Sequence, residues 1–127
     1  MHSPVECIDA GVFLVQYSDP LTFDEVADVV ETFKQLRDEY GLDQYVTISD
    51  LSNCKNPPSD ITNARQMVVQ DKRMIGAVIV KAPLLAQIIG RIVRRVTPVD
   101  IIDVDTIDEG RAVAKKLLAG ESVNSSL

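Results

Sequence analysis

The sequence predicts one α/β domain with a mixed five-stranded sheet, in the element order β-β-α-β-α-β-α-β-α. Two short apolar runs near the start, Val5 to Ile8 and Val12 to Tyr17, are separated by only three residues, and this spacing predicts an antiparallel hairpin. The later apolar runs alternate with helical patterns, which is typical of parallel strands joined by right-handed helical crossovers. We therefore expect the first strand alone to run antiparallel, within a domain of residues 1–119 that a polar tail at 120–127 follows.

The composition favours a soluble globular domain and argues against several classes of function. The 127 residues carry a net charge of −6, whereas a general nucleic-acid binder needs a concentrated basic face. No apolar run reaches about 18 residues, so we expect no membrane insertion. Cys7 and Cys54 stand alone, without metal-ligand or disulfide spacing. We therefore expect a cytoplasmic protein without a metal or a cofactor.

A helix is predicted to follow the hairpin. Thr22 and Glu25 form a T-x-x-E capping box at its start, and Gly41 is placed to end it. Its apolar residues recur at helical spacing, which gives the helix one face to bury. These residues are Phe23, Val26, Val30, Phe33 and Tyr40, with Leu36 beside them.

The stretch from Tyr45 to Ser59 combines a strand with the longest strand-to-helix loop of the chain. Residues alternate until Asp50, with Thr47 and Ser49 on the polar side, so we expect a half-buried strand that ends there. The polar side also suggests that the helices crowd one face of the sheet and leave part of the other exposed. A second helix is predicted at 60–73 with Ser59 as its N-cap.

The rest of the chain continues the alternation of strands and helices. Ile75 to Val80 is apolar on both sides and predicts the most buried strand. A third helix is expected to begin at Pro83 and to end before Pro98. Val99 to Val104 predicts the last strand, and a T-x-x-E box at Thr106 starts the closing helix.

The segments TISDLSN, GAVIVKAPLLAQIIGRIV and DVDTIDEGRAVAKKLL, in this element order, resemble the STAS domains (sulfate transporter and anti-sigma-factor antagonist). The chain looks most similar to their stand-alone bacterial SpoIIAA-like branch, whose D-L-S step is matched by Asp50, Leu51 and Ser52. The resemblance implies a β-α superhelix and a regulatory role through protein binding. Antagonist members carry a phosphorylated serine in a D-S-S-G step near the position of Ser59, where this chain has neither the aspartate before nor the glycine after it. The branch also borders on lipid-binding domains of the CRAL-TRIO kind.

Polar residues at strand ends are the candidate binding site. Asp50, Ser52, Lys81 and Asp103 would converge at the carboxyl edge of the sheet, where open α/β sheets usually bind their ligands. The plainer interpretation is that each of them only begins a turn or solvates a strand end.

The start of the second helix is the other part of this candidate site. Ser59 and Asp60 lie there, and Ser59 is also a candidate phosphorylation site, since a phosphate is stabilised at a helix N-terminus. The plainer role of Ser59 is that of an N-cap. We expect no enzyme, because no nucleophile with a base is legible and the only histidine is His2.

The third helix is apolar around more of its circumference than one buried face requires. We therefore expect a homodimer contact, with Ile89 and Val93 at the interface and Arg91 and Arg94 at its rim.

Two functions compete at this point. The first is a non-catalytic regulatory module that docks a protein partner through the loop 50–59 and the start of the second helix. The second is a carrier of a small molecule or lipid, which would need an enclosed apolar cavity of about 300 Å3 or more between sheet and helices.

Overall fold

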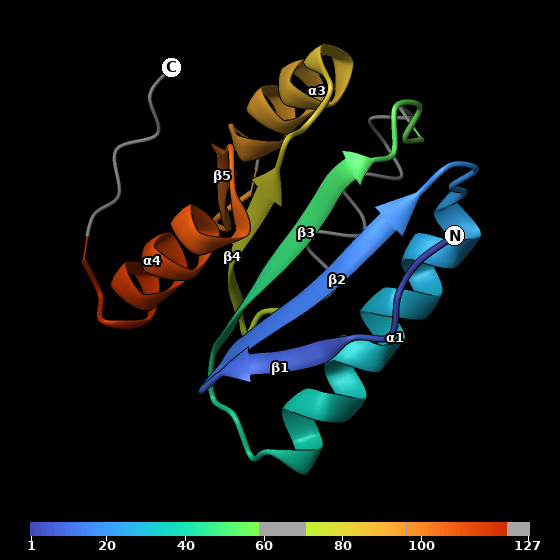
Figure 1. Cartoon of the computed structure of the whole chain (residues 1–127). Coiled ribbons are helices and arrows are strands. Elements are labelled where there is room, and N and C mark those ends of the chain that lie inside the picture. The colour runs from blue at the N-terminus through green and yellow to red at the C-terminus, as the bar shows by residue number, and fades with distance from the viewer. Residues whose placement is uncertain (59–70, 96, 122–127) are drawn as a thin grey trace.

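The computed structural model describes residues 1–58, 71–95 and 97–121, which form a five-stranded sheet with helices on both faces (Figure 1). The strands are β1 (Glu6–Asp9), β2 (Val12–Ser18), β3 (Tyr45–Asn53), β4 (Met74–Val80) and β5 (Asp100–Val104). The described helices are α1 (Phe23–Glu39), α3 (Leu84–Arg94) and α4 (Ile107–Leu118). The strands stand in chain order, with β1 antiparallel to β2 and every other pair parallel. The predicted mixed sheet with one antiparallel strand is confirmed.

The parallel register aligns one apolar residue from each of four strands. Leu14 pairs with Ile48, Ile48 with Val78, and Val78 with Ile102. Together with Val12, Val46, Ala114 and Leu117 they belong to the core between the sheet and α4. A Cβ atom built on Gly110 of α4 would lie 3.3 Å from Val78 Cγ1, so glycine lets this helix approach the sheet closely.

The opposite face of the sheet is covered by α1 and α3. Its core is aromatic near α1, where the ring of Phe13 lies 6.2 Å from that of Phe33 and 5.5 Å from that of Tyr45, between centroids. Val29, which the predicted apolar stripe of this helix omitted, is fully buried, whereas Tyr40 is 57% exposed. The helices therefore form a layer on each side of the sheet, and α1 and α4 lie on opposite sides (Figure 1).

The prediction of a half-buried strand that ends at Asp50 is wrong. β3 continues to Asn53, and Thr47 is only 3% exposed. The reason is that the face carrying Thr47 lies under α1 and α3, while the face carrying Val46 and Ile48 lies under α4. Thr47 tolerates this burial because its hydroxyl contacts Met74 Sδ at 3.7 Å.

Both predicted capping boxes form at helix starts. Thr22 Oγ1 accepts a hydrogen bond from the backbone N–H of Glu25 at 3.3 Å, and Thr106 Oγ1 accepts one from that of Glu109 at 3.1 Å. After α1, Gly41 adopts a φ of +63°, as expected of a glycine that ends a helix.

The helix predicted at 60–73 lies mostly outside the described residues, as does the tail from 122 onward. Asp71 to Arg73 form a turn, so the expectation that the helix continues to Arg73 is wrong. The backbone N–H of Arg73 donates to the carboxylate of Asp71 at 3.0 Å, and that of Met74 donates to the carbonyl of Asp71 at 3.2 Å. An aspartate that caps its own turn in this way competes with helix.

Candidate functional site

A polar hollow of about 290 Å3 lies at the carboxyl edge of the sheet, between the ends of β3 and β4 and the start of α4. We call it the carboxyl-edge hollow. Its lining residues are Asp50, Ser52, Val80, Lys81, Asp105, Thr106, Ile107 and Asp108. Three of the predicted site residues, Asp50, Ser52 and Lys81, are thus brought together.

Asp50 lies on the wall of this hollow and is only 6% exposed. Its carboxylate accepts hydrogen bonds from Gln16 Nε2 at 3.2 Å, from the backbone N–H of Ser52 at 2.9 Å and from the hydroxyl of Ser52. Burial acts to raise the pKa of Asp50, but the bonds from Ser52 and Gln16 and the charge of Lys81 outweigh it and lower the pKa. Asp50 is therefore an ionised, firmly oriented group at neutral pH.

Lys81 directly follows β4 and has a φ of +54°, in the left-handed region that lysine rarely adopts. Its backbone N–H donates to the carbonyl of Val104 at 2.9 Å, which continues the pairing of β4 with β5 beyond the strand. The turn toward α3 begins here, so this hydrogen bond holds the chain in the strained conformation and leaves the Lys81 side chain exposed at the hollow.

Asp103 does not join the other three predicted residues. Side chains alternate along β5, so Ile102 and Val104 face α4 while Ile101 and Asp103 lie on the α3 side. Asp103 keeps an exposed surface, but partial loss of solvent around its carboxyl raises its pKa, and the charge of Arg91 on α3 opposes this rise. Ser59 and Asp60, the remaining two predicted residues, lie outside the described residues.

Asp19 was missed by sequence reasoning, yet it organises the loop that leaves β3. Its carboxylate accepts hydrogen bonds from the backbone N–H groups of Lys55 at 2.8 Å and Asn56 at 3.1 Å, and the Cys54 thiol donates to it at 3.5 Å. The two backbone bonds lower the pKa of Asp19. Its position beside Pro20, after the strand that neighbours β3, indicates a turn but does not reveal which backbone groups it binds.

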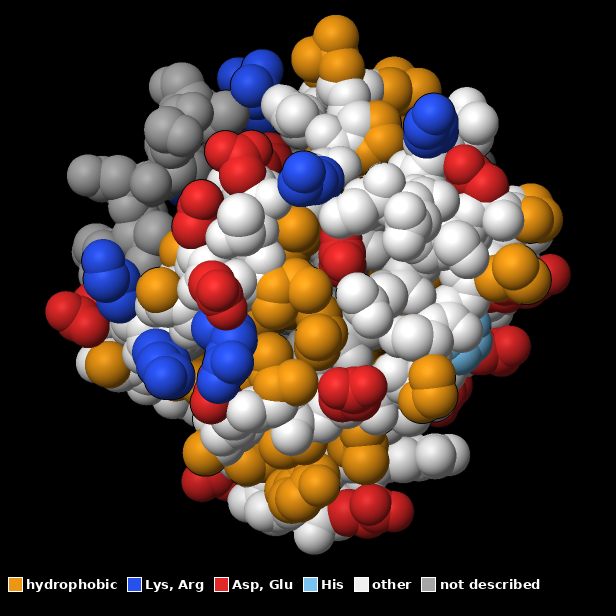
Figure 2. All heavy atoms as spheres, in the orientation of Figure 1, with side chains coloured by type: hydrophobic (Ala, Val, Ile, Leu, Met, Phe, Trp, Pro, Cys, Tyr) orange, Lys and Arg blue, Asp and Glu red, His pale blue; other side chains and the backbone are white. Residues whose placement is uncertain are grey.

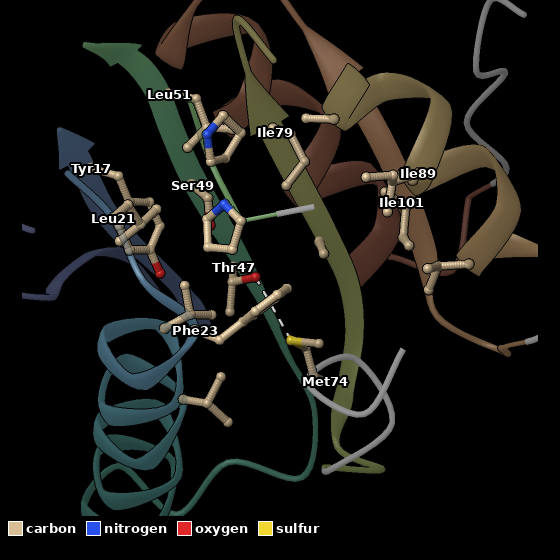
Figure 3. Close-up of a pocket in the computed structure, with 18 of the residues that line it drawn as sticks. Tyr17, Leu21, Phe23, Thr47, Ser49, Leu51, Met74, Ile79, Ile89 and Ile101 are labelled. Atoms are coloured by element: carbon tan, nitrogen blue, oxygen red, sulfur yellow. Dashed lines mark hydrogen bonds between the residues drawn. The ribbon is translucent and has the colours of Figure 1, made fainter. Parts of the chain in front are cut away.

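An apolar groove of about 220 Å3 lies between α1 and α3, over the second face of the sheet. In Figure 3, side chains from α1, from the sheet and from α3 converge on it, among them Phe23, Ile79 and Ile89. Pro57 and Pro58, at the end of the loop that Asp19 holds, also line it. The groove, as lined by the described residues, is smaller than the cavity of about 300 Å3 that we set as the criterion for a carrier.

The placement of the predicted interface residues on α3 is corrected by the structure. Ile89 is 8% exposed and Val93 is 1% exposed, so both belong to the core rather than to a subunit surface. The sequence could not assign the buried side, because this helix has apolar residues on two sides. The exposed ones are Leu84 (70%), Leu85 (56%), Ile88 (42%) and Ile92 (41%), which we call the α3 apolar face.

Metal binding and cysteine chemistry depend on how these side chains are placed in the structure. Among the described residues, no group of three or more histidine, cysteine or acidic side chains is arranged to hold a metal ion. Cys54 is fully buried. Burial, and to a smaller extent the neighbouring Asp19 carboxylate, raise the pKa of the Cys54 thiol to about 11, which disfavours the nucleophilic thiolate. No helix in the described part is both long and apolar enough to cross a bilayer.

The fold and the site define an α/β domain with a mixed sheet, a helical layer on each face, a polar hollow at the carboxyl edge and an exposed apolar helix face. Comparison with protein-family models, with curated proteins and with solved structures finds no match to this chain.

Proposed function

We propose that this protein is a non-catalytic interaction domain that docks a protein partner at the carboxyl edge of its sheet. The observation that carries this proposal is the concentration of exposed hydrophobic side chains on one element. Four of the six large hydrophobic side chains that are exposed in the described part belong to α3. Single exposed hydrophobic residues are common, but several on one helix are typical of an interaction surface.

The carboxyl-edge hollow adds a polar region to the same side of the molecule. Lys81 lies in the hollow and precedes α3 by three residues, so the hollow and the start of the α3 apolar face adjoin each other. An apolar centre with a polar rim is the usual composition of a protein interface.

The loop after β3 supports docking at this edge because it is held in place before any partner arrives. Asp19 fixes the backbone of Lys55 and Asn56, while Ser52 and Asn53 remain exposed. A preorganised surface loses less conformational entropy on binding than a loose loop does. The proposed docking surface therefore comprises residues 50–58, which are the end of β3 as far as Asn53 and the loop that follows it.

We further propose that the domain is related to the STAS domains, of the stand-alone SpoIIAA-like kind. Its support is the D-L-S step of Asp50, Leu51 and Ser52, which stands at the end of β3, together with a strand order in which β1 alone is antiparallel. Regulatory binding of a protein partner is the function that this relationship implies.

A carrier of an apolar ligand is the second candidate function, and the groove between α1 and α3 is the observation that favours it. Among the described residues that line it, most are apolar, and Tyr17, Thr47 and Ser49 carry the hydroxyl groups. Native mass spectrometry of freshly purified protein tests this candidate directly: a retained small molecule would support a carrier, and a mass equal to that of the bare chain would argue against it.

Site-directed photo-crosslinking in the cells of origin tests the docking proposal. A photoreactive amino acid at Ser52, on the proposed surface, should give a specific protein adduct. The matched control is the same group at Asp43, an exposed residue before β3 and thus at the opposite edge of the sheet. Absence of an adduct at Ser52, or equal adducts at both positions, would reject the proposal.

A further inference from the structure

We propose that the α3 apolar face binds an acidic amphipathic segment of the partner, in which apolar side chains recur every three or four residues between aspartates and glutamates. This inference rests on the proposed function, because it names the chemistry of the partner that docks at the carboxyl edge. It is carried by the geometry and the charge of α3.

The geometry of α3 produces two separate apolar sides. At about 100° per residue, Ile89 and Val93 lie on one side of α3, where both are buried and line the groove between α1 and α3. Gly90 lies close against β5, where a Cβ atom would be 3.6 Å from Ile101. Leu84 and Ile88 project from a different side of the helix, one turn apart. A partner helix that meets this side can use its own residues at the same spacing.

The charge of α3 differs from that of the rest of the chain. The stretch from Lys81 to Arg95 contains four basic residues and no acidic one, in a protein whose net charge is −6. Figure 2 shows hydrophobic side chains over α3 at the top of the molecule, with lysine and arginine side chains beside them. Arg91 and Arg95 are both exposed. The charge of Arg91 acts on Asp103 of the neighbouring strand β5, where it opposes the rise in the pKa of that carboxyl.

A basic rim around an apolar face favours an acidic partner, since complementary charge directs association and like charge opposes it. A second copy of this chain is disfavoured for the same reason. Packing two α3 helices face to face would bring Arg91, Arg94 and Arg95 of both copies into one contact to which neither helix contributes an acid. A helix pair of about 11 residues also buries less surface than a stable dimer needs, about 1,200 Å2 or more.

An anionic membrane is disfavoured by the surroundings of α3. The neighbouring hollow carries Asp50, Asp105 and Asp108, and these charges, like the net charge of the chain, would be repelled by acidic headgroups within about 10 Å of the surface. A narrow protein segment can follow α3 alone and avoid them.

Binding of a model peptide to the whole protein tests the inference. The probe is a fluorescent synthetic peptide about 18 residues long, with leucine at every third or fourth position and glutamate elsewhere, and its control has lysine in place of glutamate. We expect fluorescence anisotropy to report binding of the glutamate peptide only. The double variant Arg91→Glu/Arg95→Glu should weaken this binding by about tenfold or more, and Leu84→Ser/Ile88→Ser should weaken it similarly.

The matched control is Lys72→Glu/Lys116→Glu, which reverses two exposed charges away from α3 and should change binding by less than about twofold. An equal loss with this control, or equal binding of the lysine peptide, would overturn the inference. So would binding to phosphatidylserine vesicles without binding to the peptide, or a dimer in sedimentation velocity that Ile88→Asp dissociates. Strong destabilisation by Leu84→Ser/Ile88→Ser in urea would show that the chain covers this face itself, and would equally refute it.

The two proposals can fail separately. If the photoreactive group at Ser52 captures a specific protein while the α3 variants leave that adduct unchanged, the domain docks a partner and only the α3 inference is wrong. If Ser52 captures nothing, the docking function itself is rejected.

Discussion

The hydroxyl of Tyr45 donates a hydrogen bond of 2.6 Å to the carboxylate of Asp71, and so ties the first residue of β3 to the turn before β4. The same oxygen accepts a bond of 2.7 Å from Arg37 Nη1 near the end of α1. Asp71 is 6% exposed. Three elements therefore meet at one buried carboxylate on the edge of the sheet opposite to the proposed docking site.

Asp71→Asn should destabilise the fold by about 2 kcal/mol at neutral pH, because it removes one of the two carboxylates that pair with the partly buried guanidinium of Arg37 and leaves only Asp38, at 3.0 Å. Urea unfolding followed by circular dichroism measures this loss. The control Asp43→Asn, at an exposed position, should change stability by less than about 0.5 kcal/mol. A loss for Asp71→Asn no larger than that of the control would contradict the structural role of the carboxylate.

The same site predicts a pH dependence. Burial acts to raise the pKa of Asp71, but the hydrogen bonds from Tyr45, Arg73 and Arg37 outweigh it, so the pKa is lowered from 3.8. A carboxylate with a lowered pKa stabilises the fold fully above its unfolded pKa, and this stabilisation is lost as the pH falls below that value. Acid unfolding of the native protein should therefore be steeper than that of Asp71→Asn.

Contacts between residues close in the chain could be predicted from the sequence, whereas contacts between distant residues could not. Thr22 and Glu25 predict a helix start because the contact between them is local, and it forms as expected. The contacts of Asp19 with Lys55 and of Arg37 with Asp71 join residues more than thirty positions apart. No local sequence pattern identifies such a partner, because these contacts form only when the tertiary structure brings the two residues together.

The polar residues on β3 and the apolar residues on α3 illustrate a second limit. Thr47 looks like a solvent-facing residue in an alternating strand, but α1 and α3 cover its face of the sheet. In α3, Ile88 and Ile89 are equally apolar in sequence, and only the folded structure shows that Ile89 is buried at the groove between α1 and α3 while Ile88 is exposed. Of the candidate site, the chain order correctly placed Asp50, Ser52 and Lys81 at one edge, whereas the face that each residue occupies required the structure.

Asp19→Ala should loosen the loop after β3 without unfolding the domain. It removes the acceptor for the backbone N–H groups of Lys55 and Asn56, so these two amides should exchange with deuterium faster. Amide exchange followed by NMR measures the effect residue by residue. Asp24→Ala, an exposed change in the first turn of α1, is the control and should leave both amides unchanged. Unchanged protection in Asp19→Ala would show that the clamp does not order the loop.

Ile89 and Ile88 provide a neighbouring pair with opposite expectations. Ile89→Ala should cost about 2–4 kcal/mol because Ile89 is only 8% exposed and its removal leaves a cavity. Ile88→Ala should cost less than about 1 kcal/mol, since 42% of Ile88 is already in solvent. Urea unfolding of both variants shows which side of α3 is buried. Equal losses of stability in the two variants would mean that α3 is rotated about its axis relative to the described structure.

Lys81→Gly should stabilise the domain by about 0.5–1 kcal/mol. A side chain at a φ of +54° is strained, and glycine relieves that strain at the cost of a more flexible unfolded chain. Lys81→Ala is the control, because it also removes the charge but keeps the Cβ atom, and it should bring no gain. A gain in stability for Lys81→Gly alone would show that the native lysine is held in a strained backbone conformation. Equal stability of the two variants would show that this conformation is not strained.

The closest approach between the sheet and α4 gives the final prediction. A Cβ atom on Gly76 would lie 2.6 Å from Leu117 Cδ1, whereas its next contact, with Val46, is an ordinary 3.5 Å. Gly76→Ala should therefore cost about 1 kcal/mol, the low end of the usual cost of overpacking in a core, because the close atom is the end of a side chain that can move. Leu117→Val removes the clashing Cδ1 atom, so the same alanine should cost clearly less in that background. A double-mutant cycle in urea measures this difference as a coupling energy between the two residues. A cost of Gly76→Ala that is equal in both backgrounds would show that the backbone of β4, rather than the side chain of Leu117, resists the extra methyl group.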